Sequence, residues 1–480
     1  MMRLLYISLL LIPAFCFAQV SDDVLKEYSG LGLPMIYITT VNGEEPTSSV
    51  IYGPIRGATL TDIVPKEGRM QIFRADTLWY DSGEYQKDES GIKIKHRGNS
   101  SAVSYRNKPF KLTLEKKADL IITPEDDGTD KRSKHWVLLN CSFSIRSHFI
   151  SQLAKLIEME YAPRVEYVNV IINNDYRGIY ILSENVRRET CRVDVDKDDG
   201  YIIELDAYYW NEPFSIRSKF TGFLQWILKY PAPEDLTPKQ EANIRSDIER
   251  LEKAVSASNY PEVIDVHSVA RWILLHDILG TYDPSGSNIF VARKNREPSS
   301  LMRMPVGWDM DSSMDIKRLN EWSRTHTEVG IFLSHLFANQ YCPDFNLAYI
   351  NDWRRVLGAG VMEQMAQSCL DFPNTAQGQG LTRSYPLHAK RWGWDPSIFD
   401  VESQSKADAE WFTGRKQTLD VLVKGLEDNV TAIRNPSEEI REGGFIRKQI
   451  CNGRIIIVAD GKTYTVDGKK IGLAPCIYKK

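Results

Sequence analysis

The period of the hydrophobic residues changes along this chain of 480 residues, and this change constrains the fold more than any other feature. In residues 33–115 and again in 165–206, apolar residues alternate with polar ones or gather in short runs between Gly, Pro and Asn. This is typical of β-strands, whose successive side chains point to opposite faces. From about residue 235, apolar residues recur every three or four positions, as in amphipathic helices. The sequence therefore predicts an α+β protein with a β-rich N-terminal part (about 30–205) and a helical C-terminal part (about 235–430).

Three segments make this prediction specific. In "KPFKLTLE" the residues Phe110, Leu112 and Leu114 face one way and the polar residues between them face the other. One helix, "SIRSHFISQLAKLIEME", is embedded among the strands at 144–160. A further helix opens at Thr237, with Gln240 three residues later, and this spacing predicts a capping box.

Both ends of the chain differ from the rest. Residues 1–18 combine Arg3, a short apolar run and a small-x-small ending at Ala18, which predicts a cleaved secretory signal. No later stretch is apolar enough to span a membrane, so we expect an exported protein in the periplasm, on the cell surface or in the medium. Residues 446–480 predict a small β segment with Asp-Gly turns. Cys451 and Cys476 flank it and form a candidate disulfide.

The overall charge excludes one class of partner. The formal net charge is −4 and the isoelectric point is near 6.1. Proteins that bind nucleic acid through the phosphate backbone usually carry a basic excess. We therefore expect no nucleic-acid partner.

An acidic stretch at 281–313 carries the first candidate site. Asp283 and Asn288 have the spacing D-x-x-x-x-N, and Asp309 and Asp311 follow the next apolar run, which reads as a strand. Kinases use one Asp to orient the attacking hydroxyl, and an Asn and a later Asp to hold magnesium ions that bridge the phosphates. If residues 305–311 form a strand, Asp309 and Asp311 point to the same side. The alternatives are a type I turn at "DPSG" and a charged strand end. A glycosidase-like acid pair is a third, since residues two apart on a strand lie about 6–7 Å apart.

A polar turn carries the second candidate site. Arg97, Gly98, Asn99 and Ser100 follow the strand-like run 91–96, and such a turn can offer backbone N–H groups to a phosphate. Lys108 and Lys111 follow at the start of the next strand, where their ammonium groups could reach the same phosphate. The alternative is an ordinary hairpin with solvated lysines.

Together these stretches resemble the CotH family, the spore-coat-protein-H-like secreted kinases. The resemblance covers roughly residues 33–425 and keeps the order of the family. The matching segments are "LPMIYITT", "KHRGNSS", "NKPFKLTLEKK", "KHWVLLNCSFSIRSHFISQLAKLIE", "YVNVIINNDYRGIYILSENV", "GYIIELD", "GTYDPSGSNIFV", "PVGWDMDSS" and "EWFTGRKQTLDVLV".

The resemblance implies an atypical, bilobal protein-kinase-like domain at 19–435 that binds ATP with Mg²⁺ or Mn²⁺ between its lobes. It implies that Asp283 orients the acceptor hydroxyl and that Asp309 is the main metal ligand, with Asn288 and Asp311 nearby. It places residues 97–101 at the phosphates, Lys108 and Lys111 as phosphate contacts, and Glu184 and the "IIELD" strand near the adenine. The acceptor would be a Ser or Thr of an exported protein.

The chain departs from the family pattern at several points. Ala102-Val103 stands where the family often has a Trp, and Pro284 stiffens a loop that is often rich in Gly or Asn. Glu158 is the one candidate for a glutamate that pairs with a lysine. A catalytically inactive, kinase-like scaffold or surface-binding protein therefore remains the alternative. The tail resembles the C-terminal β modules of exported proteins from Bacteroidetes-type bacteria, some of which are sorting signals, and a simple β appendage is the other interpretation.

Overall fold

The structure is a computed structural model of the chain. The predicted signal peptide and Asp283 both lie outside the part of the chain that it describes. Within that part, no helix is both long enough and apolar enough to cross a lipid bilayer. The described ranges are 22–54, 57–122, 128–141, 144–219, 224–257, 259–282, 287–327, 344–434, 446–451, 454–459, 462–464 and 470–471.

The N-terminal part forms a large sheet of eight strands. In spatial order they are β1-β9-β10-β8-β7-β6-β4-β5, and β1 also pairs with β4, so the sheet closes on itself into a barrel with β5 attached to β4. The pairing of β1 with β9 is parallel and the other pairings are antiparallel. The strands are β1 (Met35–Thr40), β4 (Lys66–Arg74), β5 (Thr77–Asp81), β6 (Ile92–His96), β7 (Phe110–Ala118), β8 (Ser133–Asn140), β9 (Val165–Ile172) and β10 (Asp175–Glu184).

The barrel separates two sets of side chains on β7. Phe110, Leu112 and Leu114 are buried in the apolar interior, as the alternation predicts. Lys111 points to the outer face, where the strand register places it directly opposite Lys95 of β6. The cationic side chains therefore lie outside the barrel core.

A second, antiparallel sheet follows in the chain, in the spatial order β12-β13-β11-β14-β15. One face of its central strand carries Ile203 and Leu205, which belong to the largest core cluster together with residues of α4 and α5. Glu204 and Asp206 alternate with them and belong to the opposite face. The elements are β11 (Tyr201–Asp206), β12 (Ser215–Arg217), β13 (Gln225–Tyr230), β14 (Ile289–Arg293), β15 (Met302–Arg303), α4 (Pro238–Ala257) and α5 (Val266–Leu279).

Two small elements lie beside the barrel. The strands β2 (Thr47–Tyr52) and β3 (Ala58–Val64) form a two-stranded ribbon, and β3 contacts the short helix α2 (Ser100–Ser104). Gly57, at the end of the ribbon, lies so close to the Tyr208 ring that a Cβ there would be 2.7 Å from it. The ribbon therefore reaches from the barrel to the segment that follows β11.

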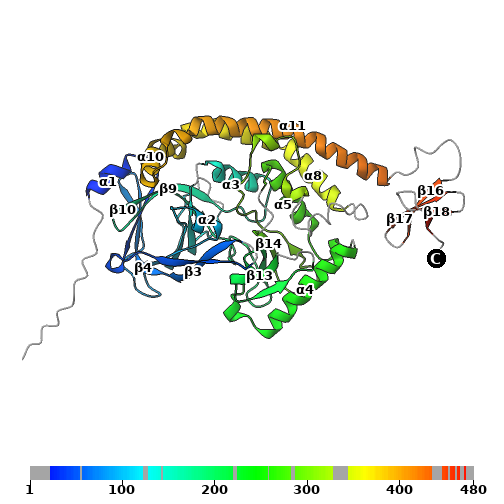
Figure 1. The fold of residues 1–480 in the computed structure, drawn as a ribbon, viewed down its shortest axis with the longest axis horizontal. Coiled ribbons are helices and arrows are strands. Elements are labelled where there is room, and N and C mark those ends of the chain that lie inside the picture. Colours follow the sequence, from blue (N-terminus) through cyan, green and yellow to red (C-terminus); the bar gives the residue numbers. More distant parts are fainter. Residues whose placement is uncertain are drawn as a thin grey trace, which may run out of the picture.

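The remaining helices pack around α5 and against the barrel (Figure 1). α10 contacts β9 and β10, and α11 runs along the top of the view in contact with α5, α8, α9 and α10. They are α1 (Asp22–Ser29), α3 (Arg146–Leu156), α6 (Arg324–Thr327), α8 (Asp344–Gly358), α9 (Val361–Asp371), α10 (Ala376–Trp392) and α11 (Val401–Arg434). The 3-10 helices are η1 (Val41–Gly43), η2 (Tyr209–Asn211), η3 (Pro233–Asp235), η4 (Tyr260–Glu262), η5 (Ile316–Arg318), η6 (Phe372–Asn374) and η7 (Pro396–Ile398).

Local sequence signals explain where the two central helices begin. The backbone N–H of Gln240 donates to Oγ1 of Thr237 (3.3 Å), and the backbone N–H of Thr237 donates to Oε1 of Gln240 (3.1 Å). The predicted capping box of α4 is thus confirmed. Asp265 caps α5 by accepting from the N–H of His267 (3.0 Å), and Gly280 ends it in the left-handed conformation.

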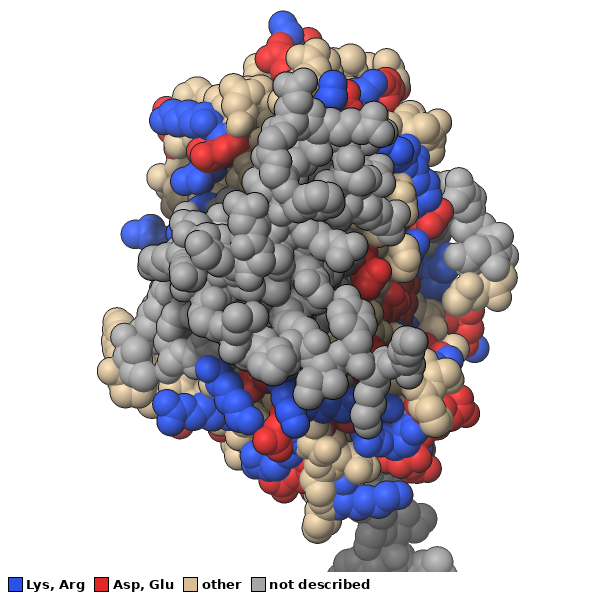
Figure 2. All heavy atoms as spheres, turned by 90° about the vertical axis from the view of Figure 1, so that its right-hand side faces the viewer, with Lys and Arg blue, Asp and Glu red and all other residues tan. Residues whose placement is uncertain are grey.

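The end of the chain forms a small antiparallel sheet, drawn at the right of Figure 1, which agrees with the predicted β segment. Its strands are β16 (Ile446–Cys451), β17 (Arg454–Ala459), β18 (Lys462–Tyr464) and β19 (Lys470–Ile471). The side chain of Cys451 and all of Cys476 lie outside the described part. Figure 2 views the molecule from this side and shows acidic and basic residues interspersed around the atoms that are not described.

Candidate active site

Asn288 and Asp309 meet at the start of β14. Nδ2 of Asn288 donates a hydrogen bond of 3.2 Å to Oδ2 of Asp309. Both residues have a left-handed backbone, with φ of 70° and 60°. Residues other than glycine rarely adopt this conformation, and it costs free energy that the surroundings must supply. The structure thus brings together two of the residues expected at the metal site, and Asp309 is exposed to solvent.

The strand predicted around Asp309 is absent. β15 ends at Arg303, Val306 forms only an isolated bridge with Tyr161, and residues 307–311 have no strand structure. The left-handed turn at Asp309 interrupts the extended backbone that the apolar run predicts. The strand argument for placing Asp311 beside Asp309 is therefore wrong, and so is the acid-pair spacing built on it. Asp311 itself is exposed.

Two buried carboxylates of β11 hold the chain next to Asn288. Oε1 of Glu204 accepts from the backbone N–H of Asn288 (2.9 Å), and its Oε2 lies 2.7 Å from Nζ of Lys229. Oδ1 of Asp206 accepts from the Ser287 hydroxyl and from the backbone N–H of Tyr208 (3.1 Å). Burial and the neighbouring Glu204 raise the pKa of Asp206 to about 6. The sequence signal for this pair is the two acids in the otherwise apolar "YIIELD".

Arg97 brings the polar turn of the barrel to this site. Burial lowers the pKa of its guanidinium, and the carboxylates of Asp309 and Glu204 oppose this effect. The turn is not a simple hairpin, because α2 begins at Ser100 within it. Gly98 has a φ of 99°, and the Asn99 side chain accepts from the Thr59 hydroxyl (2.6 Å). Residues 97–100 thus lie between the β2–β3 ribbon and the acidic residues.

Lys111 belongs to the same positive region. Burial, and then the cations Lys95, Arg187, Arg97 and Lys229, lower its pKa to about 8. Repulsion among like charges in one small region indicates that an anion would be stabilised there.

Lys108 acts on His96 of the neighbouring strand. With Arg177, and after burial, it lowers the pKa of His96 to about 4, and His96 lies on the same face of β6 as the buried Ile92 and Ile94. The structure therefore brings Lys111 together with Arg97, and it places Lys108 close to His96.

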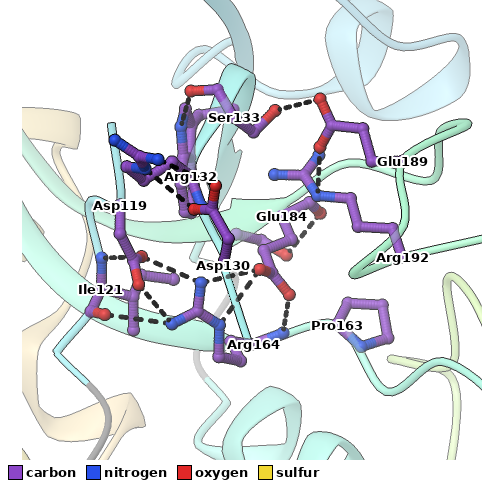
Figure 3. Close-up of polar contacts among 12 residues, drawn as sticks. Asp119, Ile121, Asp130, Arg132, Ser133, Pro163, Arg164, Glu184, Glu189 and Arg192 are labelled. Atoms are coloured by element: carbon purple, nitrogen blue, oxygen red, sulfur yellow. Dashed lines mark hydrogen bonds and ion pairs between the residues drawn. The ribbon is translucent and has the colours of Figure 1, made fainter. Parts of the chain in front are cut away.

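Glu184 lies at the end of β10, on the same face of the strand as Leu182 of the barrel interior. Figure 3 shows its contacts with Arg164. The register pairs Glu184 with Trp136, whereas Ser183 and Val137 share the face of Lys111. Its carboxylate accepts from the backbone N–H (3.0 Å) and the guanidinium of Arg164 (2.8 Å), which also binds Asp119. Glu184 is only 2% exposed, so its polar atoms are committed to this network.

A polar pocket of about 310 Å³ lies where the chain leaves the barrel after β10. Arg187, Lys134, His135 and Glu189 are in its wall. The Glu189 carboxylate is held by Ser133 and Arg192 (Figure 3). Burial and then Arg187, Lys111, Arg192 and Lys134 lower the pKa of His135 to about 3. This pocket is therefore electrostatically continuous with the region around Lys111.

The donors at Asn288 and Asp309 suit a hard divalent cation. Among the described residues, no group of three or more His, Cys, Asp or Glu side chains surrounds a common point. Magnesium sites in phosphoryl-transfer enzymes commonly have one or two protein ligands, and phosphate and water oxygens complete the octahedron. The Asp309 carboxylate and the amide oxygen of Asn288 meet this requirement. Asp283, the expected third polar residue, lies outside the described part.

Within the described part of the chain, the structure does not pair Glu158, the glutamate expected beside a lysine, with a lysine of the site. Glu158 follows α3, is exposed, and lies 3.2 Å from Nη1 of Arg355. The pair next to Asn288 is Lys229–Glu204 instead.

Comparisons with known proteins agree with this picture at the level of family. A search of the curated proteins found no match. The model of a protein family described as "CotH kinase protein" matches residues 94–366, which is more than half of the chain and includes both the turn at Arg97 and the Asn288–Asp309 pair. The chain belongs to the CotH kinase family.

Proposed function

We propose that this chain is an exported protein kinase with a diverged, bilobal kinase-like fold. It would transfer the γ-phosphoryl group of ATP to a Ser or Thr hydroxyl of another exported or surface protein. The observation that carries the proposal is the convergence of Asn288 and Asp309 with Arg97 and Lys111, because it joins donors for a metal ion to cations for phosphate. The predicted signal at residues 1–18 supports export.

Each residue then has a defined task. Asp309 and Asn288 would hold Mg²⁺ or Mn²⁺, which neutralises charge on the phosphates when bound. Arg97 and Lys111 would bind phosphate oxygens from the barrel side. The nucleoside end would extend toward the pocket beside Arg187 and His135.

The chemical step needs little from the protein beyond position and charge. The acceptor oxygen forms a bond to the γ-phosphorus while the bond to the leaving oxygen of ADP breaks. Asp283 would orient the acceptor hydroxyl and take its proton. This role of Asp283 rests on the family resemblance.

The test is transfer of labelled γ-phosphate by purified residues 19–480 with Mg²⁺ or Mn²⁺ and a generic acceptor. Asp283→Ala and Asp309→Ala are the controls, matched for folding by circular dichroism. We expect transfer by the wild type and its loss in both variants. Absence of both transfer and metal-dependent ATP binding by calorimetry would overturn the proposal in favour of a kinase-like scaffold.

A further inference from the structure

The loop that leads into β14 is attached to the rest of the site by two consecutive residues. Ser287 donates its hydroxyl to Asp206, and Asn288 donates its backbone N–H to Glu204. Glu204 and Asp206 are two apart on β11, so the spacing of a strand carries both acceptors on one face. Both are only 4% exposed.

These two hydrogen bonds can hold the backbone of Asn288 in its left-handed conformation. A left-handed residue other than glycine relaxes unless its neighbours hold it. The bond from Glu204 fixes the N–H of Asn288, and the bond from Asp206 fixes the residue before it. The side chain of Asn288 can then meet Asp309.

The two carboxylates are themselves held from the other side. Glu204 is paired with Lys229 of β13, and although burial opposes the lysine charge, this pairing raises the pKa of Lys229. Asp206 also accepts from the N–H of Tyr208. The hydrogen bonds of Asp206 and Glu204 to Ser287 and Asn288 give both carboxylates a direct route to the Asn288–Asp309 pair.

We propose that Asp206 and Glu204 are positioning residues that clamp Ser287 and Asn288 and thereby set the geometry of the Asn288–Asp309 pair. The expected effect of this clamp on kcat rests on the proposed function. Its structural consequence, an ordered loop at 287–289, does not depend on activity. The two consequences are therefore tested separately.

The structural arm measures amide hydrogen exchange of peptides that cover 287–293, in the protein without nucleotide. Ser287→Ala and Asp206→Ala remove the bond, whereas Ser287→Thr and Asp206→Asn keep a donor and an acceptor. We expect faster exchange at Asn288 and Ile289 in the two alanine variants only, with α11 unchanged in all. Ser299→Ala, an exposed serine in the turn before β15, is the matched control. Unchanged exchange in Ser287→Ala, a small substitution at a half-buried site, would overturn the clamp.

The catalytic arm measures kcat and the KM for ATP in the same variants. Loss of a residue that orients a metal ligand typically costs roughly 10- to 100-fold in activity or metal affinity. We expect a loss of this size in kcat with Ser287→Ala, a smaller change in KM, and recovery with Ser287→Thr. The double variant Asp206→Ala/Ser287→Ala should be no worse than the poorer single variant, because both substitutions remove the same hydrogen bond between Ser287 and Asp206. Additive losses, or no recovery by threonine, would refute the clamp. If the wild type transfers no phosphate, the proposed function fails while the exchange arm still decides the clamp.

Discussion

Asn288 and Asp309 are joined by a side-chain hydrogen bond, and both adopt the left-handed conformation that side chains other than glycine avoid. They are 21 residues apart in sequence, Asn288 directly before β14 and Asp309 in the segment that follows β15. Strain at two residues in contact is typical of functional sites, where it is retained because the geometry is needed. We expect substitutions at this pair and at the residues around it to change ligand binding and the free energy of unfolding in different ways.

Two substitutions of Asn288 should differ in their effect on stability but not in their effect on ATP binding. Glycine adopts a positive φ without steric cost, whereas alanine pays about 1 kcal/mol. We therefore expect Asn288→Gly to be more stable than Asn288→Ala by about this amount, measured by urea unfolding. Both should lose metal-dependent ATP binding, because both lack the amide. Equal stability of the two variants would contradict the left-handed conformation at this position.

Lys111 should lower stability in the protein without ligand. Its pKa is lowered to about 8 by burial and neighbouring cations, so folding disfavours the charged form and stability rises with pH between about 8 and 10.5. Lys111→Met should raise the free energy of unfolding at pH 7 by about 1–3 kcal/mol and weaken ATP binding. Lys111→Arg, which keeps the charge, should not be stabilised. A methionine variant that is less stable than the wild type would contradict the prediction, because it would show that the charge of Lys111 does not destabilise the folded protein.

The carboxyl group of Asp206 should make stability depend on pH in the direction opposite to most acids. Its pKa is raised to about 6 from 3.8, so the folded state binds the proton more tightly than the unfolded state. Its contribution to stability is therefore greatest below pH 4 and is lost as the pH rises to 6 and above. Relative to wild type, Asp206→Asn should gain up to about 3 kcal/mol across this window. The check is urea unfolding of both proteins at pH 4.5, 5.5 and 7, and a constant difference would refute the raised pKa.

Glu184 should contribute to the stability of the barrel and not to the affinity for ATP. Glu184→Ala leaves the guanidinium of Arg164 partly uncompensated in a buried setting, and loss of one partner of a buried pair costs about 3–5 kcal/mol. We expect a lower melting temperature, and an unchanged Kd for ATP in the fraction that remains folded. Arg74→Met, which breaks a separate ion pair between Arg74 of β4 and Glu166 of β9, is the matched control. A selective loss of ATP affinity in Glu184→Ala would instead place Glu184 in the nucleotide site.

Much of the fold is visible in the sequence because it depends on local patterns. The alternation in 110–114 and the capping box at Thr237 each involve residues close together in the chain, and both are confirmed. Closure of the barrel depends on pairing β1 with both β4 and β9, and no pattern in residues 35–40 specifies two partners so far apart in sequence. The apolar run before Asp309 predicts a strand because composition does not reveal a left-handed turn. The sequence does not predict that Glu204 and Asp206 of β11 hold Ser287 and Asn288, because the fold brings together residues that are about 80 positions apart.

The long helix α11 has a consequence for how ligands reach this site. Its 34 residues span about 50 Å. Arg415 and Trp411 bind the backbone carbonyls of Asp277 and Ile278 at the end of α5, while Arg391 of the neighbouring α10 binds Asp175 of the barrel. The two helices therefore connect the barrel to α5, and we expect this connection to oppose a change in the separation between them. If the chain binds ATP as proposed, we expect binding without a large domain closure, and the affinity would then not be reduced by the free energy of such a closure.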